Sequence, residues 1–319
     1  MEVLSVLFVA VLLLLGLVGL IWMSDCDLLL WWKSHFGAGI GSVAGKVIWI
    51  TGASSGIGEF LAYELAKGGA RLVLSARRTD ELERVKNKCM SRSQLKEDDI
   101  LVLKLDVLDF NSHSVAAEKV RSHFGKIDIL VNNAGRSQRG MAVDTSNEVE
   151  KEMMELNALS VFSLTKKVLP HMVERKEGHI VVTSSVAGKL GTPLSASYSA
   201  TKFALQGWFD ALRIEQYQNN INVTMVCPGP VFSNILSQAF TEASGEKYGK
   251  DMKPTENRMS TQRCAELMAV AIANQMYEVW ISPNPPLLFV YLSQYSPTLA
   301  RWVGGRIGMK TIKRLRDEL

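Results

Sequence analysis

The sequence predicts an α/β fold, a doubly wound parallel sheet of the Rossmann-like kind, preceded by an N-terminal membrane helix. Three observations lead to this prediction. Short apolar runs alternate with helical patterns along most of the chain, and a glycine-rich turn joins the first of these runs to a helix. About 20 almost wholly apolar residues come before them all. Such alternation is typical of a parallel sheet covered by helices on both faces.

Composition supports a folded chain and argues against several classes of protein. Of the 319 residues, 47% are hydrophobic and 21% are charged, so a large core can form. The net charge of +4 is not gathered in one long basic block, which argues against a nucleic-acid partner. The four cysteines contain no Cys-x-x-Cys pair and the five histidines show no metal spacing, so we expect no disulfide framework and no metal site.

Residues 1–23 are predicted to form a membrane anchor. The run from Val3 to Met23 has the length and composition of a spanning helix. A cleaved signal peptide is the alternative, but no Lys or Arg precedes the run. Residues 24–45 are predicted to be a linker near the membrane surface, with glycines that suit a flexible tether. Tryptophan rings favour the headgroup level, and they stand at Trp22, Trp31 and Trp32.

A dinucleotide-binding catalytic domain is predicted over residues 46–282, and it begins with a β-α-β unit. Val47–Ile50 is a short apolar run typical of a buried strand, and the turn Thr51–Gly58 carries three glycines. The helix after it ends before a second strand at Arg71–Ser75. Bare backbone lets a pyrophosphate approach closely, and the helix N-terminus offers it unpaired N–H groups.

Further strands and helices continue the alternation. The strands are expected at Ile100–Leu105, Ile127–Val131, His179–Thr183 and Asn222–Cys227, and the longest helices near 147–174 and 197–218. Because the carboxyl ends of parallel strands border the ligand crevice, residues that follow these strands are candidates for the site.

The end of the second strand indicates which dinucleotide is bound. An acidic residue there would hydrogen-bond the ribose of NAD, but the chain has Ala76, followed by Arg77 and Arg78. A guanidinium fork matches a phosphate dianion, so the pattern favours NADPH/NADP+. The alternative is a solvated arginine pair that caps Thr79–Asp80.

The candidate chemistry lies on one helix face. Tyr198 and Lys202 are four residues apart, so both project from the same side of a helix, although such pairs also occur on solvated helices. A lysine ammonium stabilises a nearby phenolate and makes a tyrosine a usable acid and base. Ser185 follows a strand and can hydrogen-bond a reacting oxygen. Ser184 is an equal candidate by composition, and the spacing to Tyr198 selects its neighbour.

Together these motifs resemble the short-chain dehydrogenase/reductase family, single-domain type, from Lys46 to about Ser282. The resemblance implies that Tyr198 is the acid/base and that Ser185 orients the substrate carbonyl. It also implies that Lys202 tunes the tyrosine and holds the ribose, and that Asn157 fixes a proton-relay water. The implied cofactor-binding residues are Thr51, Gly52, Ser54, Ser55, Gly56, Ile57, Gly58, Arg77, Arg78, Asp106, Val107, Asn133, Ala134, Gly135, Tyr198, Lys202, Pro228, Gly229, Val231 and Ser233. Ser233 replaces the family's more frequent Thr.

The same resemblance implies a homodimeric oxidoreductase that moves a hydride between the nicotinamide and a carbonyl or alcohol carbon. Within the family, the anchor and the segments Ser75–Arg78, Glu81–Lys86 and Glu278–Ser282 are similar to a membrane-bound subgroup. That implies lipophilic substrates and a place in steroid, retinoid or lipid metabolism. The stretch Phe232–Met259 is expected to be a mobile substrate lid. Two alternatives stay open, a membrane-tethered scaffold that binds NADPH without turnover and an NAD-linked alcohol oxidation.

Residues 283–319 are predicted to form an amphipathic basic tail. Prolines break the chain at its start, Leu287–Leu292 is apolar, and Arg and Lys residues follow. The pattern fits contact with a membrane surface and equally fits packing over the substrate pocket or a dimer partner. The final Arg316–Leu319 resembles an endoplasmic reticulum retrieval signal, so we expect that membrane. A charge bias around the anchor favours a cytosolic body, which leaves the side open.

Overall fold

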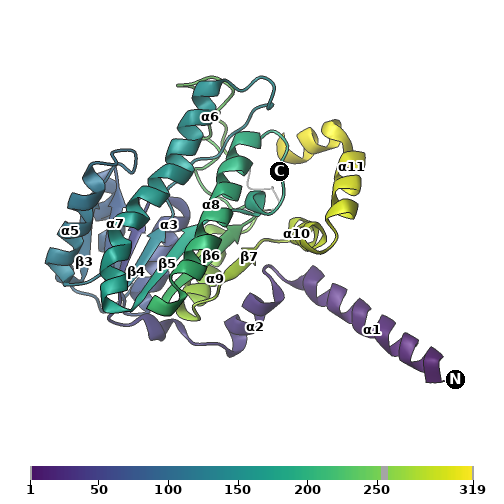
Figure 1. Cartoon of the computed structure of the whole chain (residues 1–319), viewed down its shortest axis with the longest axis horizontal. Coiled ribbons are helices and arrows are strands. Elements are labelled where there is room, and N and C mark those ends of the chain that lie inside the picture. The colour runs from purple at the N-terminus through teal and green to yellow at the C-terminus, as the bar shows by residue number, and fades with distance from the viewer. Residues whose placement is uncertain (1, 253–257, 318–319) are drawn as a thin grey trace.

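The structure, a computed structural model, describes residues 2–252 and 258–317 and confirms the predicted α/β fold. A parallel sheet of seven strands runs in the order β3-β2-β1-β4-β5-β6-β7, and the long helix α1 projects from this body (Figure 1). The strands are β1 (Val47–Thr51), β2 (Arg71–Ala76), β3 (Ile100–Lys104), β4 (Ile129–Asn132), β5 (Gly178–Thr183), β6 (Ile221–Pro228) and β7 (Glu278–Ile281). The strand order reverses between β1 and β4, which is where open α/β sheets bind ligands.

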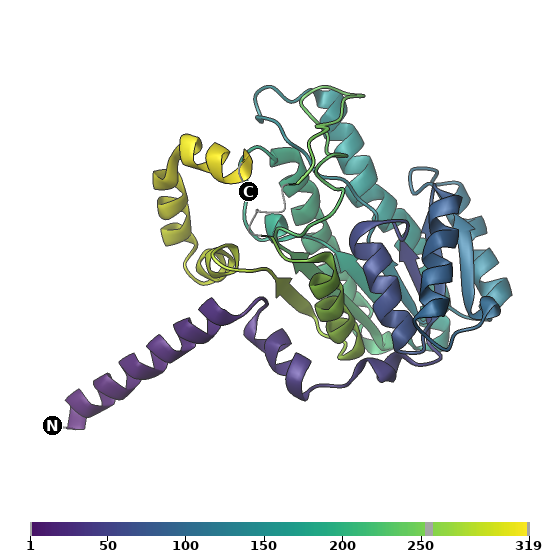
Figure 2. The same ribbon diagram turned by 180° about the vertical axis from the view of Figure 1, so that it is seen from behind.

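Helices lie on both sides of the sheet (Figures 1 and 2), and two hydrophobic clusters fill the spaces between the sheet and these helices. One face is covered by α3 (Gly56–Lys67), α4 (Thr79–Ser91) and α9 (Thr261–Ala273). The other is covered by α5 (Ser112–Phe124), α7 (Ser160–Arg175) and α8 (Ala196–Glu215). Ile48 packs in the first cluster and its neighbour Trp49 in the second. Because β1 is buried on both faces, it reads as a continuous apolar run.

The long helix expected near 147–174 is divided by a change of winding. It consists of α6 (Asn147–Met154), the π-helical turn η3 (Glu155–Leu159) and then α7. Such single π turns occur frequently at functional sites. The described 3-10 helices are η1 (Ile40–Val43), η2 (Glu97–Asp99), η4 (Val186–Gly188) and η5 (Tyr217–Asn219).

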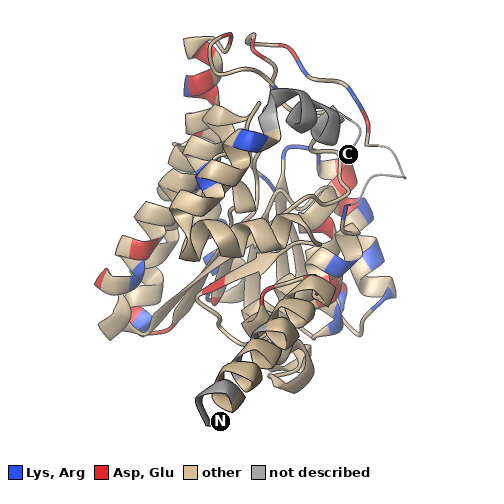
Figure 3. Cartoon of the chain, turned by 90° about the vertical axis from the view of Figure 1, so that its right-hand side faces the viewer, with Lys and Arg blue, Asp and Glu red and all other residues tan. Residues whose placement is uncertain are grey.

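Helix α1 (Glu2–Met23) is the candidate membrane anchor. Among the described residues, its stretch Ser5–Met23 is the one helical segment long and apolar enough to cross a membrane. Figure 3 shows no Lys, Arg, Asp or Glu along the coloured part of this helix. Its large side chains, such as Leu13, lie exposed, as expected for a helix whose partner is lipid rather than the body.

Residues 24–45 do not form the flexible tether that we expected. Helix α2 (Leu28–Phe36) packs on α9 and buries Leu30 completely. Just before it, the chain pairs with the edge of β7. The N–H of Asp27 donates to the Trp280 carbonyl (2.8 Å), and the N–H of Ser282 donates to the Asp25 carbonyl (2.9 Å). An edge strand offers unpaired N–H and C=O groups, which explains why the preceding segment settles there.

The tail forms two helices, α10 (Pro286–Tyr295) and α11 (Pro297–Asp317), which arch beside the body near the end of β7 (Figure 1). Helix α10 packs on the body, because Leu287 and Val290 are fully buried and the Gln294 amide donates to the Lys189 carbonyl (2.9 Å). Two expectations fall partly outside the described residues. These are the last two residues of the Arg-Asp-Glu-Leu signal and positions 253–257 of the lid.

Candidate active site

The glycine turn after β1 packs tightly against the loop that follows β4. A Cβ atom at Gly52, whose φ is +67°, would lie 2.9 Å from the Cα of Ala134. One at Gly58 would lie 2.4 Å from the Gly52 carbonyl oxygen. Side chains are therefore excluded at both positions. Ser55 at the N-cap of α3 makes no side-chain capping bond, so the helix N-terminus keeps N–H groups for an anion such as a pyrophosphate.

Asn133 joins the carboxyl ends of three neighbouring strands. Its side-chain amide donates to the Thr51 carbonyl at the end of β1 (3.0 Å), and its amide oxygen accepts from the Thr183 hydroxyl at the end of β5 (3.3 Å). The Thr51 hydroxyl in turn accepts from the N–H groups of Asn133 (3.0 Å) and Ala134 (3.1 Å). The residues expected to line the cofactor pocket are thus held together at the strand ends by hydrogen bonds within the protein.

Ser185 and Ser184, which composition could not distinguish, have different surroundings. The Ser184 hydroxyl lies between β5 and α8 and donates to the Lys202 carbonyl (3.5 Å). The Ser185 hydroxyl caps η4 by accepting from the Ala187 N–H (3.1 Å) and donates to the Pro228 carbonyl (3.2 Å). Helix α8, which carries Tyr198, packs closely on η4. The structure therefore places Ser185 in the turn that faces the tyrosine helix.

Tyr198 and Lys202 share one face of α8, as their spacing predicts. The Lys202 Nζ atom lies 5.5 Å from the centre of the Tyr198 ring and donates to the Thr183 carbonyl (2.9 Å). Lys202 is only 5% exposed, and this burial lowers the pKa of its ammonium to about 8. A lysine whose pKa is strongly perturbed by burial is typical of functional sites.

Asn157 lies in the π turn η3 and connects two parts of the site. Its side-chain oxygen accepts from the Arg136 N–H (2.9 Å), and its amide donates to the Arg136 carbonyl (2.8 Å) and to the Thr201 hydroxyl (3.3 Å). Both amide hydrogens are therefore used within the protein. A relay water held by Asn157 would have to be bound through one of its oxygens.

Arg136 is a residue of the site that sequence reasoning missed. Beyond its main-chain bonds to Asn157, its Nε atom donates to the Gln238 carbonyl (2.7 Å), and its guanidinium lies 3.9 Å from the centre of the Phe240 ring. Phe240 is 4% exposed and packs beside Tyr198. Desolvation, together with the charge of Arg77, lowers the pKa of Arg136. Arg136 thus links the described part of the expected lid to the cluster against which Tyr198 packs, and an isolated arginine in a loop gave no sequence signal of this contact.

The described part of the lid is more ordered than we expected. Phe240 donates its N–H to the Ser137 carbonyl (2.9 Å) and accepts from the Arg139 N–H (2.8 Å). Further along, the Ser146 N–H donates to the Glu242 carbonyl (2.9 Å). The lid therefore pairs, main chain to main chain, with the loop between β4 and α6.

The remaining cofactor candidates surround the glycine turn. The Arg78 Nη2 atom donates to the hydroxyls of Ser54 (3.2 Å) and Ser55 (3.3 Å), and both Arg77 and Arg78 are exposed. The Ser233 Cβ atom lies 3.4 Å from where a side chain at Gly56 would begin. The other expected positions follow strand ends: Asp106 and Val107 after β3, Gly135 after β4, and Gly229 and Val231 after β6.

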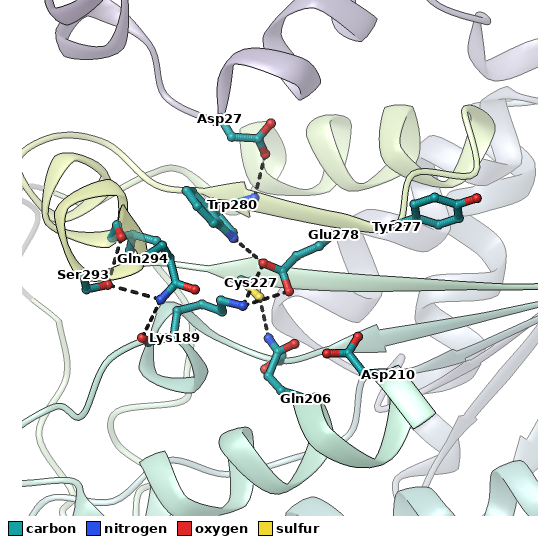
Figure 4. A network of polar contacts seen from close by, with 12 residues as sticks. Asp27, Lys189, Gln206, Asp210, Cys227, Tyr277, Glu278, Trp280, Ser293 and Gln294 are labelled. Atoms are coloured by element: carbon teal, nitrogen blue, oxygen red, sulfur yellow. Dashed lines mark hydrogen bonds and ion pairs between the residues drawn. The ribbon is translucent and has the colours of Figure 1, made fainter. Parts of the chain in front are cut away.

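The turn that begins at Ser185 ends in a polar network at β7 (Figure 4). The Lys189 Nζ atom lies 3.0 Å from a carboxylate oxygen of Glu278, and the Trp280 indole N–H donates to the same carboxylate (2.7 Å). With the bond from Gln294 to the Lys189 carbonyl, the turn is held from β7 and from α10 at once.

Comparison with known proteins places these features in context. Residues 46–244 match the family model described as short chain dehydrogenase. Dehydrogenase/reductase SDR family member 7 of Homo sapiens is 48% identical over 296 residues, which are 92% of this chain and 87% of that protein. Dehydrogenase/reductase SDR family member 7B of Mus musculus is 37% identical over 253 residues, 79% of this chain and 78% of that one.

Two solved structures share the fold over most of this chain. An alcohol dehydrogenase from the archaeon Thermococcus sibiricus, complexed with 5-hydroxy-NADP, has a TM-score of 0.65 and 28% identity and covers 75% of this chain and 97% of its own. A short-chain dehydrogenase/reductase from Burkholderia phymatum, in complex with NAD, has a TM-score of 0.68 and 25% identity and covers 81% and 96%.

Proposed function

Because the chain belongs to the short-chain dehydrogenase/reductase family, we propose that it is an NADPH-dependent carbonyl reductase or alcohol dehydrogenase for lipophilic carbonyls of the steroid, retinal or xenobiotic kind. Oxidoreductase activity with a nicotinamide cofactor follows from the family, and the choice of NADPH and of substrate class is the proposal. One observation carries the proposed chemistry: a buried lysine, Lys202, lies beside the ring of Tyr198, and its burial lowers its pKa to about 8.

Each catalytic side chain has a task that its position supports. The nicotinamide, when bound, supplies or accepts the hydride. In reduction the Tyr198 hydroxyl donates its proton to the substrate oxygen, and in oxidation it accepts one. The Lys202 ammonium stabilises the phenolate that forms. The Ser185 hydroxyl, which bonds the Pro228 carbonyl in this structure, turns to donate to the same substrate oxygen.

The arginine pair after β2 supports NADPH over NADH. The Arg78 guanidinium and the hydroxyls of Ser54 and Ser55 gather at the glycine turn, with Arg77 exposed beside them. A phosphate dianion finds charge and hydroxyl donors there, and Ala76 supplies no carboxylate to repel it. The related solved structures hold either an NADP derivative or NAD. The fold therefore does not select between the two cofactors, and the choice of NADPH is supported by these residues alone.

We place the enzyme in the endoplasmic reticulum membrane as a homodimer. Helix α1 supports a single-pass anchor, and the similarity of Arg316–Leu319 to a retrieval signal supports the endoplasmic reticulum as its location. An anchored domain meets substrates that partition into lipid, which favours steroids, retinals and similar carbonyls over sugars or small acids.

Cofactor oxidation by the reconstituted full-length protein tests the proposal. NADPH and NADH would be compared against steroid ketones, retinals and small quinones, with Tyr198→Phe as the test variant and Tyr217→Phe, an exposed tyrosine after α8, as its control. We expect NADPH turnover that is lost in the first variant and kept in the second. No turnover on any compound, with tight NADPH binding in both variants, would favour the scaffold. A preference for NADH would favour NAD-linked alcohol oxidation.

A further inference from the structure

The body end of α1 is fixed to the catalytic domain by hydrogen bonds. The side-chain amide of Asn284, which precedes α10, donates to the carbonyls of Ile21 (2.6 Å), Trp22 (2.9 Å) and Ser24 (3.3 Å). The last carbonyls of a helix have no partner within the helix, so this amide satisfies groups that would otherwise need water. The bilayer that α1 is proposed to cross therefore meets the domain at one defined place.

The segment between α1 and α2 is also held against the body by contacts. Asp25 forms an ion pair with Arg263 of α9 (2.7 Å). The Asp27 carboxylate accepts from the Leu30 N–H (2.9 Å), capping α2, and from the Trp280 N–H (2.8 Å). The Leu28 N–H donates to the Tyr291 hydroxyl of α10 (3.0 Å). Helix α2 is thus held against β7, α9 and α10, and it cannot move independently of the anchor.

The free side of α2 is apolar. Leu29, Trp32 and Phe36 are 58%, 53% and 65% exposed, and the rings of Trp32 and Phe36 lie 4.4 Å apart. Their spacing places them along one face of the helix, while Leu30 faces the body and is fully buried. We call these three residues the α2 stripe. Lys33, in the last turn of the same helix, adds a cation beside it.

The position of the α2 stripe indicates what covers it. Four residues separate α1 from α2, a reach of at most about 18 Å, so α2 begins close to where the chain leaves the hydrocarbon. The polar layer on each side of a bilayer is roughly 5–8 Å deep. Tryptophan prefers that layer, and a lysine beside it meets lipid phosphates. Figures 1 and 2 both show α2 beside the body end of α1.

We propose that the α2 stripe lies in the headgroup layer of the bilayer crossed by α1, so that α1 and α2 together set the tilt of the catalytic domain. The proposal rests on α1 being a membrane anchor, which is part of the proposed function. A spanning helix alone would leave the domain free to tilt together with the helix relative to the bilayer. A second contact beside it restricts that tilt and holds the proposed substrate site at a fixed height above the lipid.

Tryptophan quenching in the full-length protein tests this contact. The protein would be reconstituted into phosphatidylcholine vesicles whose lipids carry bromine at shallow acyl positions. Wild type would be compared with Trp32→Phe and with the matched control Trp208→Phe, which removes a ring stacked on Phe162 of the body. We expect lipid-quenched emission to fall in Trp32→Phe and to be unchanged in Trp208→Phe.

Two contrary results are distinguishable. If the protein resists alkaline carbonate extraction but Trp32→Phe keeps all of the lipid-quenched emission, the stripe is not in the bilayer and the proposal is overturned. Accessibility of Trp32 to aqueous iodide would then indicate a solvated face, and protection that depends on protein concentration would indicate a second copy. If carbonate releases the protein and Trp22 at the end of α1 is not quenched in any variant, the assignment of α1 as a membrane anchor is wrong.

Discussion

Replacing Lys202 by methionine is expected to abolish turnover and, at the same time, to stabilise the cofactor-free protein. Burial lowers the pKa of the Lys202 ammonium from 10.5 to about 8, a difference of about 2.5 units. Below pH 8 this corresponds to about 3 kcal/mol of unfavourable free energy in the folded state. Loss of the hydrogen bond to the Thr183 carbonyl offsets about 1 kcal/mol, which leaves a net gain of about 2 kcal/mol.

The pH dependence of this gain has a definite sign. Because the pKa of Lys202 is lower in the folded protein, the unfolded chain binds more protons between about pH 8 and 10.5. The stability of the wild type therefore rises with pH across that window, and the penalty is fully present below it. The advantage of Lys202→Met should shrink by about 1 kcal/mol between pH 7 and pH 9 and vanish by pH 10.

Thermal unfolding in one detergent, followed by tryptophan emission at pH 7 and pH 9, measures this effect. A gain of about 2 kcal/mol corresponds to roughly 4–8 °C in Tm for a domain of this size. Lys67→Met, which removes an exposed lysine paired with Glu64, is the control and should change Tm little at either pH. A Tm for Lys202→Met at or below that of wild type at pH 7, or a difference that does not change with pH, would refute the reasoning.

Three other changes test the cofactor site and the lid. Arg78→Ala should raise KM for NADPH roughly 10- to 100-fold and leave KM for NADH unchanged, since one charge-assisted pair is lost, and an equal rise for both would contradict a phosphate role. Gly58→Ala places a methyl group 2.4 Å from a carbonyl oxygen and should abolish NADPH binding by calorimetry, whereas wild-type affinity would show that the turn can adjust. Arg136→Met should raise the substrate KM more than it lowers kcat by releasing the lid, and Arg92→Met, which removes a guanidinium stacked on another tyrosine, should change neither. A kcat loss with unchanged KM would instead assign Arg136 to the chemical step.

Six of the seven strands could be predicted from sequence because they have strong local signals, whereas the edge strand β7 (Glu278–Ile281) was not expected. Every expected strand boundary lies within two residues of the observed one. The central strands are buried on both faces, so each reads as an apolar run bounded by turn residues. The Tyr198–Lys202 pair could also be predicted from sequence, because both residues belong to one helix and the helical repeat places them on the same face.

Other parts of the site depend on contacts between distant residues, which local patterns do not encode. Which of Ser184 and Ser185 can face the substrate depends on which hydroxyl is already hydrogen-bonded to the Lys202 carbonyl, and that is Ser184. The role of Arg136 depends on Phe240, about 100 residues later, and on how the lid folds back. The π turn around Asn157 has no sequence signature either, because its extra residue is accommodated by packing against the loop after β4.

Helix α1, the edge of the sheet and the turn that Ser185 opens form one connected set of contacts. Asn284 holds the end of α1, Asp27 covers the edge of β7, and Glu278 of β7 binds Lys189 at the end of the turn that Ser185 opens. Contiguity of this kind does not by itself transmit a signal, because that requires an element with two states. It does fix geometry. Ser185 therefore keeps one position relative to the body end of α1, and under the proposed function this arrangement favours substrates that approach from the lipid.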